Sequence, residues 1–402
     1  MPGRNVIRPL LRIFWRSLSS DRRFAQFLGS LVRFLDYIYP KNAHTIVFGS
    51  NNAKVMSGSP KALFESIQSR FPEFNVYYLL RNPSNHRQIS PLSLNGLCTF
   101  LQAKYLVSSH GLNDFFFYRA SRRKKHVSTW HGLPMKNIGL LQKGLSKQQV
   151  DAIHEYADSI SAFMVASEYD AELLSRALGF DLRKKILTGH PRNDSLVDAG
   201  VQTKKKLKSI LANVPNGAKV ILYAPTYRVP KSDNKERRAQ LFPLDDFDKE
   251  SLFRFLERDN LLLLVRAHIN DPISDQIPEH DRIVQFGFQI HENINTVLPE
   301  IDFLVTDYSS ISYDFLLVDR PIIYIPYDLD EYSKNPGFMV DDYSSWTPGA
   351  KISLMSQFFS HIDLCLQGED PYQEKRHELR KIIHQRQSKD SISRFVQMLG
   401  HL

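Results

Sequence analysis

The sequence predicts an α/β protein with two parallel-sheet domains. Short runs rich in β-branched and apolar residues alternate with amphipathic helical patterns from residue 44 to about residue 327. This alternation is typical of parallel βαβ units and doubly wound sheets. It stops at a polar seam near residue 200 and restarts at residue 219, and 402 residues exceed what one hydrophobic core usually supports. We therefore expect two Rossmann-like domains that face a cleft.

The first domain is expected over residues 43–200. Two clear helical patterns, SPKALFESIQSRF and EYDAELLSRALGF, follow the first and the fifth of its strands. The six expected strands, each running into a loop, cover residues 44–50, 75–82, 103–111, 126–132, 162–168 and 185–192.

The second domain is expected over residues 201–370. Basic amphipathic helices are expected to follow it over residues 371–402. The five expected strands of this domain cover residues 219–228, 260–268, 282–286, 301–307 and 321–327.

Residues 1–42 are predicted to form amphipathic helices at a membrane surface. Arg8, Arg12 and Arg16 recur every four residues with apolar side chains between them. Basic and aromatic helices of this kind lie in the headgroup region of a bilayer. The alternative is a pair of helices packed on the first domain. No apolar run reaches the length of about 18 residues that a membrane span needs, so any attachment is expected to be peripheral. A second apolar face is expected from Phe24, Phe27, Leu28, Leu31, Phe34 and Leu35.

The composition restricts the class of partner and the compartment. The formal net charge of +9 favours an anionic partner: a nucleic acid, a phosphorylated substrate or an anionic membrane face. Cys98 and Cys365 are far apart in the sequence and form neither a disulfide framework nor a zinc motif, which fits a reducing cytosol.

Polar clusters follow six of the expected strands. In open parallel sheets, ligands bind at the carboxyl ends of the strands, where loops and helix N-termini converge. Six clusters at equivalent positions therefore predict a binding site in the cleft. They occupy residues 108–111, 129–136, 189–194, 224–228, 266–268 and 306–310.

The residue types in these clusters suit a phosphate ester. Cations neutralise phosphate charge, while hydroxyls and helix amides hold its oxygens. GxGxxG, P-loop and HExxH motifs do not occur, which disfavours nicotinamide binding, P-loop hydrolysis and zinc proteolysis. Neither a metal nor another cofactor is expected. Two acidic pairs, Asp246/Asp248 and Asp328/Asp330, offer a carboxylate-bound metal as the alternative, but Asp248 is better explained as a helix cap and Asp330 lies in a loop after a strand. The recurring residues are His131, Lys136, His190, Arg192, Arg228, Arg266, His268, Ser309 and Ser310.

Four motifs resemble the CDP-glycerol glycerophosphotransferases, which include teichoic-acid primases and polymerases and their capsule-polymer relatives. The motifs are STWHGLPMKNIG, GHPRNDSL, ILYAPTYR and LVTDYSSISYDFLLVDRPIIYIPYDLDEY, and they occur in the family's order between residues 45 and 345. The resemblance implies a glycosyltransferase-B type fold, peripheral attachment to the cytoplasmic membrane face, and transfer of a polyol phosphate from a CDP-activated donor. HGLP stands where HGTP is commoner, and GHPR where GYPR is commoner, so the donor and acceptor stay open.

The expected catalytic residues are His131 and His268. A histidine is suited to take a proton from an attacking hydroxyl near neutral pH, and the resemblance implies this role for His131. His268 would stabilise the departing CMP, and Arg228 and Arg266 would contact the donor phosphates. The acceptor side of the cleft is expected to hold His110, Lys136, His190, Arg192 and Asn193.

The stretch LVTDYSSISYDF is predicted to be the donor-phosphate half of the site. A strand ends at Thr306 and a helix begins near Ser309 or Ser310, so exposed amides and hydroxyls meet there. Asp307 and Asp314 are acidic and would repel a pyrophosphate, so we expect them to cap the helix or to orient a cation. The alternative is an ordinary capping sequence.

The predicted function is transfer of glycerol phosphate from CDP-glycerol to a hydroxyl of a lipid-linked or polymeric acceptor, with release of CMP. Two enzymatic alternatives keep the fold and change the donor to CDP-ribitol or to a nucleotide sugar. A third alternative, a basic nucleic-acid-binding protein, rests on the charge alone, because no nucleic-acid-binding motif occurs. A fourth is a non-catalytic scaffold that kept the fold.

Overall fold

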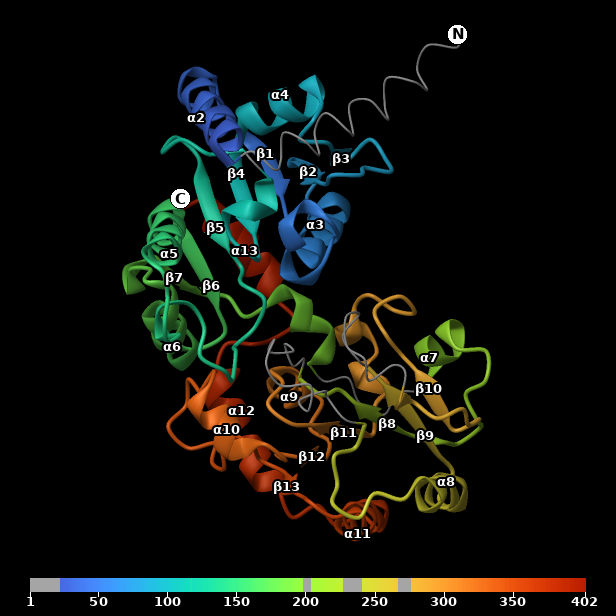
Figure 1. The fold of residues 1–402 in the computed structure, drawn as a ribbon. Helices are drawn as coiled ribbons and strands as arrows, with labels where there is room; N and C mark the ends of the chain where they lie inside the picture. The colour runs from blue at the N-terminus through green and yellow to red at the C-terminus, as the bar shows by residue number, and fades with distance from the viewer. Residues whose placement is uncertain (1–21, 117, 198–203, 227–240, 267–275) are drawn as a thin grey trace.

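The chain forms two parallel β-sheets, each with helices packed against it (Figure 1). The computed structural model describes residues 22–116, 118–197, 204–226, 241–266 and 276–402. All eleven strands expected from the sequence are present, and neighbouring strands in both sheets run parallel. The prediction of an α/β protein with parallel sheets is confirmed.

The first sheet has seven strands, and its winding reverses between β1 and β4. The chain moves outward from β1 to β3 and then returns to β4 on the other side of β1. A crevice forms outside the carboxyl ends of the strands at such a reversal. The sequence did not predict β3. In spatial order the strands are β3 (Gln88–Ile89), β2 (Asn75–Leu79), β1 (Asn42–Phe48), β4 (Ala103–Ser108), β5 (Lys125–Ser128), β6 (Ala162–Val165) and β7 (Lys185–Leu187).

The second sheet repeats this winding with six strands. Its reversal falls between β8 and β11. The short strand β13 was also not predicted. In spatial order the strands are β10 (Ile283–Gln285), β9 (Leu261–Val265), β8 (Lys219–Tyr223), β11 (Phe303–Thr306), β12 (Ile322–Tyr324) and β13 (Ala350–Lys351).

Burial explains why these segments are strands. Every residue of Leu261–Val265 and of Ala162–Val165 is buried. Helices cover both faces of a parallel sheet, so its central strands are continuous apolar runs instead of alternating patterns. This is why short apolar runs located the strands correctly in the sequence.

Helices connect the strands, and several have N-caps that the sequence encodes. Ser167 accepts a hydrogen bond from the amide of Asp170, and Asp248 accepts one from the amide of Ser251. The cap predicted at Asp248 is confirmed. The helices are α2 (Arg22–Ile38), α3 (Gly58–Arg70), α4 (Leu94–Gln102), α5 (Lys147–Ser159), α6 (Glu168–Leu178), α7 (Lys205–Ile210), α8 (Lys249–Arg258), α9 (Ile311–Phe315), α10 (Leu329–Lys334), α11 (Met355–Leu366), α12 (Gln373–Ile383) and α13 (Ser391–Leu399).

Helix α2 is fixed to the first sheet by a buried ionic network. The carboxylate of Asp36 lies 2.9 Å from the ammonium of Lys124 and 2.8 Å from that of Lys41. It also accepts a hydrogen bond from the amide of Ser121. Breaking such a buried pair leaves an uncompensated charge, so this network holds α2 in one position. Residues 1–21, the first part of the predicted amphipathic segment, lie outside the described part of the chain.

One side of α2 faces solvent with large apolar side chains. Phe27 and Phe34 are 64% and 62% exposed, and Tyr37 is 61% exposed, whereas Val32 is buried. The described residues contain no helix long and apolar enough to cross a membrane.

The last helix, α13, packs on the first sheet. The sequence analysis placed the helices of residues 371–402 after the second domain and did not predict this return to the first. Ile392 and Phe395 of α13 share a buried cluster with Ile46 and Phe48 of β1. The hydroxyl of Tyr105 in β4 donates to the carbonyl of Leu399. Figure 1 shows the chain leaving the second sheet through α12 and returning to the first sheet in α13.

Candidate active site

Three strand ends bring the candidate site together at the reversal of the first sheet. His110 follows β4, His131 follows β5, and a turn at Asn51–Ala53 follows β1. These positions agree with the rule that ligands bind outside the carboxyl ends of strands at a reversal.

His131 has one ring nitrogen fixed and the other available. Its Nδ1 lies 3.1 Å from the carbonyl oxygen of Ser109. A carbonyl only accepts hydrogen bonds, so Nδ1 carries the proton and Nε2 presents a lone pair. The ring stacks on His110 with a centroid distance of 4.4 Å and an interplanar angle of 6°, and Trp130 lies 4.2 Å away on a tilted plane. The arrangement provides a hydrogen-bond acceptor suited to receive a proton.

The two histidines have pKa values below that of an ordinary histidine. Loss of solvation lowers the pKa of His131, and repulsion from His110 when that ring is protonated and from Arg192 and Lys136 lowers it further. Loss of solvation also lowers the pKa of His110, although the charge of Asp114 opposes this effect. Both rings are therefore neutral at neutral pH, as a general base must be.

The turn after β1 holds an uncommon backbone conformation beside His110. Asn51, Asn52 and Ala53 have φ angles of 47°, 55° and 59°, a left-handed region that residues other than glycine rarely adopt. The amide of Asn51 donates to Nδ1 of His110 over 3.3 Å. The strain therefore occurs where the chain supports the histidine pair.

Asp114 connects this turn to the segment that carries the histidines. It is fully buried, and one carboxylate oxygen accepts hydrogen bonds from the amides of Ser109 (2.8 Å) and His110 (2.7 Å). The other oxygen accepts from the amide of Asn52 over 2.9 Å. Because the carbonyl of Ser109 sets the tautomer of His131, Asp114 positions the base without touching it.

Asp114→Asn is expected to lower kcat by about tenfold to a hundredfold, because an amide NH₂ cannot accept the hydrogen bonds that a carboxylate oxygen accepts. The substrate KM values should change little. Steady-state assays of nucleotide release test the rate, and ¹⁵N NMR of His131 reports whether Nδ1 still carries the proton.

The exposed Asp158→Asn in α5 is the matched control. Wild-type kcat and tautomer in Asp114→Asn would remove Asp114 from the mechanism. A loss of stability with an unchanged tautomer would assign it a purely structural role.

A cavity of about 1510 Å³ opens beside the histidine pair. Its walls come from the loops after β1, β4 and β5, from α5 and from α2. The predicted residues that line it are His110, His131 and Lys136.

Arg192 joins the loop of His131 to the second sheet. Its guanidinium donates to the carbonyl of His131 over 2.6 Å and to Asp314 of α9 over 2.8 Å. A Cβ atom added at Gly132, whose φ is +124°, would lie 2.6 Å from this guanidinium, so only glycine fits there. The predicted orientation of a cation by Asp314 corresponds to this pair.

Two asparagines complete the network around Asp314. Asn193 donates to one carboxylate oxygen over 2.7 Å, and Asn295 donates to the other over 3.3 Å and to Asn193 over 2.8 Å. Asn193 is fully buried and Asp314 is 7% exposed. Asn193 therefore connects the two halves instead of lining the cleft as the sequence suggested, and Asp314 is its partner in the second half.

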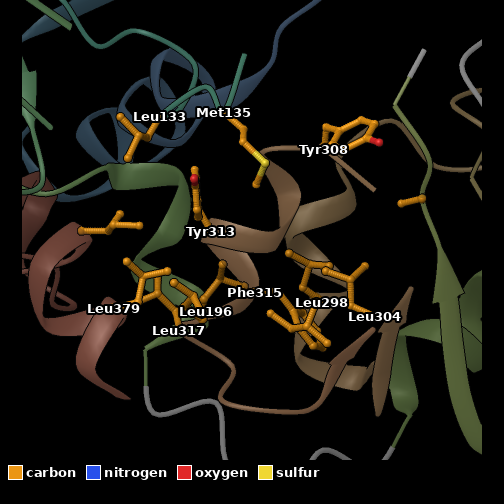
Figure 2. Close-up of a cluster of buried hydrophobic side chains, with 14 of the residues drawn as sticks. Leu133, Met135, Leu196, Leu298, Leu304, Tyr308, Tyr313, Phe315, Leu317 and Leu379 are labelled. Carbon is orange, nitrogen blue, oxygen red and sulfur yellow. The ribbon is translucent and has the colours of Figure 1, made fainter. Parts of the chain in front are cut away.

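The loop after His131 is seated in the core of the second half. The amide of Asn137 donates to the carbonyl of Gly337, and the amide of Met339 donates to that of Met135. Figure 2 shows Leu133 and Met135 above Tyr313 of α9, within a buried cluster that spans both halves. The position of His131 is therefore set from both sheets.

At the carboxyl end of β11, two predicted donor-binding side chains have structural contacts instead. Thr306 is fully buried and its hydroxyl donates to the carbonyl of Ala224. Asp307 accepts hydrogen bonds from the amide and the hydroxyl of Thr226, so it fastens the loop after β8 and does not cap α9. The expected helix does begin here, with Ser310 as its N-cap.

Two further predictions change with the structure. His190 is buried, and its Nε2 lies 3.1 Å from the carboxylate of Asp170, so it belongs to the core and not to the cleft. Arg266 donates to the carbonyls of Phe286, His291 and Glu292, and burial lowers its pKa to about 10. It supports the loop after β10.

Arg228 and His268 lie outside the described residues. Ser310 is exposed and Ser309 is partly exposed at the end of β11. Within the described ranges, no group of three or more His, Cys, Asp or Glu residues could hold a metal ion.

A family model matches residues 31–400 of the chain, and it describes CDP-glycerol:poly(glycerophosphate) glycerophosphotransferases. The chain belongs to this family. The resemblance found in four sequence motifs is thereby confirmed, and the protein is a transferase of the glycerophosphotransferase family.

The curated relatives differ in length: the chain covers most of one of them and less than half of another. The chain is 29% identical over 323 residues to a teichoic acid glycerol-phosphate transferase of Staphylococcus aureus, covering 77% of this chain and 80% of that protein. It is 29% identical over 339 residues to a teichoic acid poly(glycerol phosphate) polymerase of Bacillus subtilis, covering 80% of this chain but 44% of that protein. The chain thus spans less than half of that polymerase.

A ribitol-phosphate polymerase is also similar. TarL of Staphylococcus aureus is 24% identical over 369 residues, covering 88% of this chain and 62% of that protein.

Among solved structures, the wall teichoic acid polymerase TagF has the same fold as this glycerophosphotransferase. The TM-score is 0.77 at 22% identity, covering 98% of this chain and 97% of that chain. A histidine-to-asparagine variant of TagF soaked with CDPG has the same TM-score of 0.77.

Several site residues of this family member were missed in the sequence. Ser109 acts through its backbone carbonyl, which any residue supplies, so its identity carries no signal. Asp114 and Asn295 lie beyond strand ends in short 3-10 helices, Leu112–Phe115 and Ile294–Thr296, which the sequence did not predict. The one sequence signal for Asp114 was its position four residues after His110. An acidic residue so close to the polar cluster at residues 108–111 cannot be distinguished from an ordinary turn residue.

Proposed function

We propose that this protein transfers glycerol phosphate from CDP-glycerol to a hydroxyl group of a phosphorylated acceptor and releases CMP. The proposal rests on His131, which lines a wide cavity and whose Nε2 keeps a free lone pair because Nδ1 contacts the carbonyl of Ser109. Contacts from both halves of the chain hold the loop that carries this histidine. Membership of the glycerophosphotransferase family supports the donor.

In the proposed step, Nε2 of His131 takes the proton of the acceptor hydroxyl as its oxygen attacks the phosphorus that bears glycerol. The bond between that phosphorus and the bridging oxygen breaks, and CMP leaves with the bridging oxygen. Phosphoryl transfer depends mainly on positioning and charge stabilisation, so the protein's task is to align these groups.

Substrate charge would make His131 a stronger base. In the described structure, lost solvation and nearby cations lower its pKa. An anionic phosphoryl group placed beside the ring offsets those cations and favours the protonated ring. The base would therefore gain proton affinity only when the donor is bound.

On the donor side, the proposal keeps Arg228 and His268 as contacts of the pyrophosphate, with Ser309 and Ser310 beside it. The resemblance carries the assignment of the first two. The exposure of Ser310 at the end of β11 supports the others.

The proposal also places the cleft beside a membrane. The exposed aromatic side chains of α2 support this localisation, because such side chains partition into the interfacial layer of a bilayer. The acceptor would be lipid-linked or polymeric, and the protein would lie on the cytoplasmic face of the cell membrane.

CDP-ribitol is the second candidate donor, because TarL and other ribitol-phosphate polymerases are among the similar proteins. Purified protein should release CMP from CDP-glycerol in the presence of a glycerol-phosphate-primed acceptor. Parallel reactions with CDP-ribitol and with nucleotide sugars distinguish the donors. Absence of polyol transfer from CDP-glycerol to every lipid-linked or polymeric acceptor would overturn the proposal.

A further inference from the structure

The cavity beside His131 has a strongly cationic wall. Among the described residues that line it, Glu155 is the single acidic one. The cationic side chains on the wall, beyond the histidines, are Arg33, Lys54, Arg81, Arg119 and Lys136.

Most of these cationic side chains have no carboxylate nearby among the described residues. Arg119 lies 3.8 Å from Glu155. Within the described parts of the chain, no carboxylate lies within 4.0 Å of Lys54, Arg81 or Lys136, nor of Arg33. Several like charges around one cavity repel one another, so the wall favours an anionic ligand.

Two arginines of the wall are held in place before any ligand arrives. Arg81 stacks over the ring of Phe116 at 4.6 Å from its centroid, and Arg119 donates to the carbonyls of Phe116 and Tyr118, each over 3.3 Å. Loss of solvation lowers the pKa of both Arg81 and Arg119. Arg81 has lost water without gaining a carboxylate, and Arg119 has only the distant carboxylate of Glu155. Both guanidinium groups can therefore form charge-assisted hydrogen bonds with an anion, and phosphate oxygens match their planar donors.

Part of the cavity wall is formed by α2. Leu28, Gly29, Ser30 and Arg33 of this helix line it, while Phe34 of the same helix is exposed to solvent. The same cavity therefore borders both His131 and α2, the helix that carries exposed aromatic side chains.

We propose that this cationic wall is a subsite for the phosphate groups of the acceptor, as phosphodiesters or as a pyrophosphate that joins the acceptor to an apolar chain. The inference rests on the proposed function, which puts the acceptor hydroxyl at His131. Arg81 and Arg119 bind the phosphates, Arg33 receives the part nearest α2, and Lys136 receives the part nearest the base.

Direct binding tests the subsite without turnover. A fluorescent glycerol-phosphate trimer and farnesyl pyrophosphate are titrated into the full chain, and the variants Arg81→Gln and Arg119→Gln are compared with the wild type. Each substitution is expected to weaken binding by about tenfold, the value of one charge-assisted hydrogen bond, and to reduce its salt dependence. Preference for the trimer assigns the wall to chain phosphates, and preference for farnesyl pyrophosphate assigns it to a lipid-linked pyrophosphate.

Arg87→Gln is the matched control, because Arg87 also lies over an aromatic ring, that of Tyr77, at 5.8 Å but does not line the cavity. Unchanged affinity for both probes in the double variant Arg81→Gln/Arg119→Gln would overturn the subsite. The subsite would also be overturned if this double variant lost affinity for CDP-glycerol while its affinity for the two probes stayed unchanged. Failure of the proposed function would show differently, as absent transfer from CDP-glycerol in the wild type.

Discussion

His131→Ala is expected to lower kcat for transfer by about 10²–10⁴-fold, the usual contribution of a positioned general base. Residue His131 is exposed and borders the cavity, although the surrounding protein reduces the solvation of its ring, so its removal opens space to the cavity and leaves the Ser109 carbonyl accessible to water. Transfer is measured as CMP release, and retention of the fold by thermal unfolding.

Two further substitutions sharpen this test. His131→Asn keeps a donor for the carbonyl of Ser109 but has no basic nitrogen, so it should be as inactive as His131→Ala. His154→Ala, at an exposed position of α5, is the control that should keep full activity. Turnover at the wild-type rate in either His131 variant would exclude the residue as the base.

The same residue sets the expected pH dependence. The ordinary pKa of 6.5 is lowered for His131, so the ring stays neutral as the pH falls from 8 to 6.5. Activity of a general base is lost only when the ring becomes protonated, which places the acid limb of kcat/KM below pH 6.5. A limb centred at or above 6.5 would contradict this environment.

Asp314→Ala is expected to lower the free energy of unfolding by about 3–5 kcal/mol, the usual cost of breaking a buried ion pair. The side chains of Arg192 and Asp314 are 13% and 10% exposed, so solvent compensates little for the lost partner. Asn193 loses an acceptor as well. Urea unfolding measures the change, and kcat should fall with it because Arg192 no longer holds the carbonyl of His131.

A double-mutant cycle separates the pair from its surroundings. Arg192→Met alone and Asp314→Ala alone should each destabilise the protein, while the double variant should lose less than their sum. Asp330→Ala, an exposed acid of α10, is the control. Additive losses would show that the two charges do not stabilise each other.

The strand ends were predictable because central strands of parallel sheets are buried on both faces. Their apolar runs locate the strands in the sequence, and the polar residues that follow mark the carboxyl ends. The strand-end positions of His110 and His131, and the position of Ser310 beside α9, were obtained in this way.

Side-chain direction was not predictable. His190 follows β7 and Thr306 ends β11, yet His190 pairs with Asp170 in the core and Thr306 donates to the carbonyl of Ala224, just after the neighbouring strand β8. A position after a strand does not say whether a side chain turns toward the cleft or into the sheet. The contact of Arg192 with the carbonyl of His131 depends on tertiary packing between residues 61 positions apart.

The return of α13 to the first sheet has a consequence for synthesis on the ribosome. The apolar cluster around Ile46 and Phe48 receives part of its cover from residues 392–399. Chains emerge from the N-terminus onward, and domains generally fold as they appear. This first half cannot complete its core when its own strands have emerged, and it exposes apolar surface until the whole second half has been translated. The nascent chain therefore depends longest on chaperone protection in the half that carries the catalytic base.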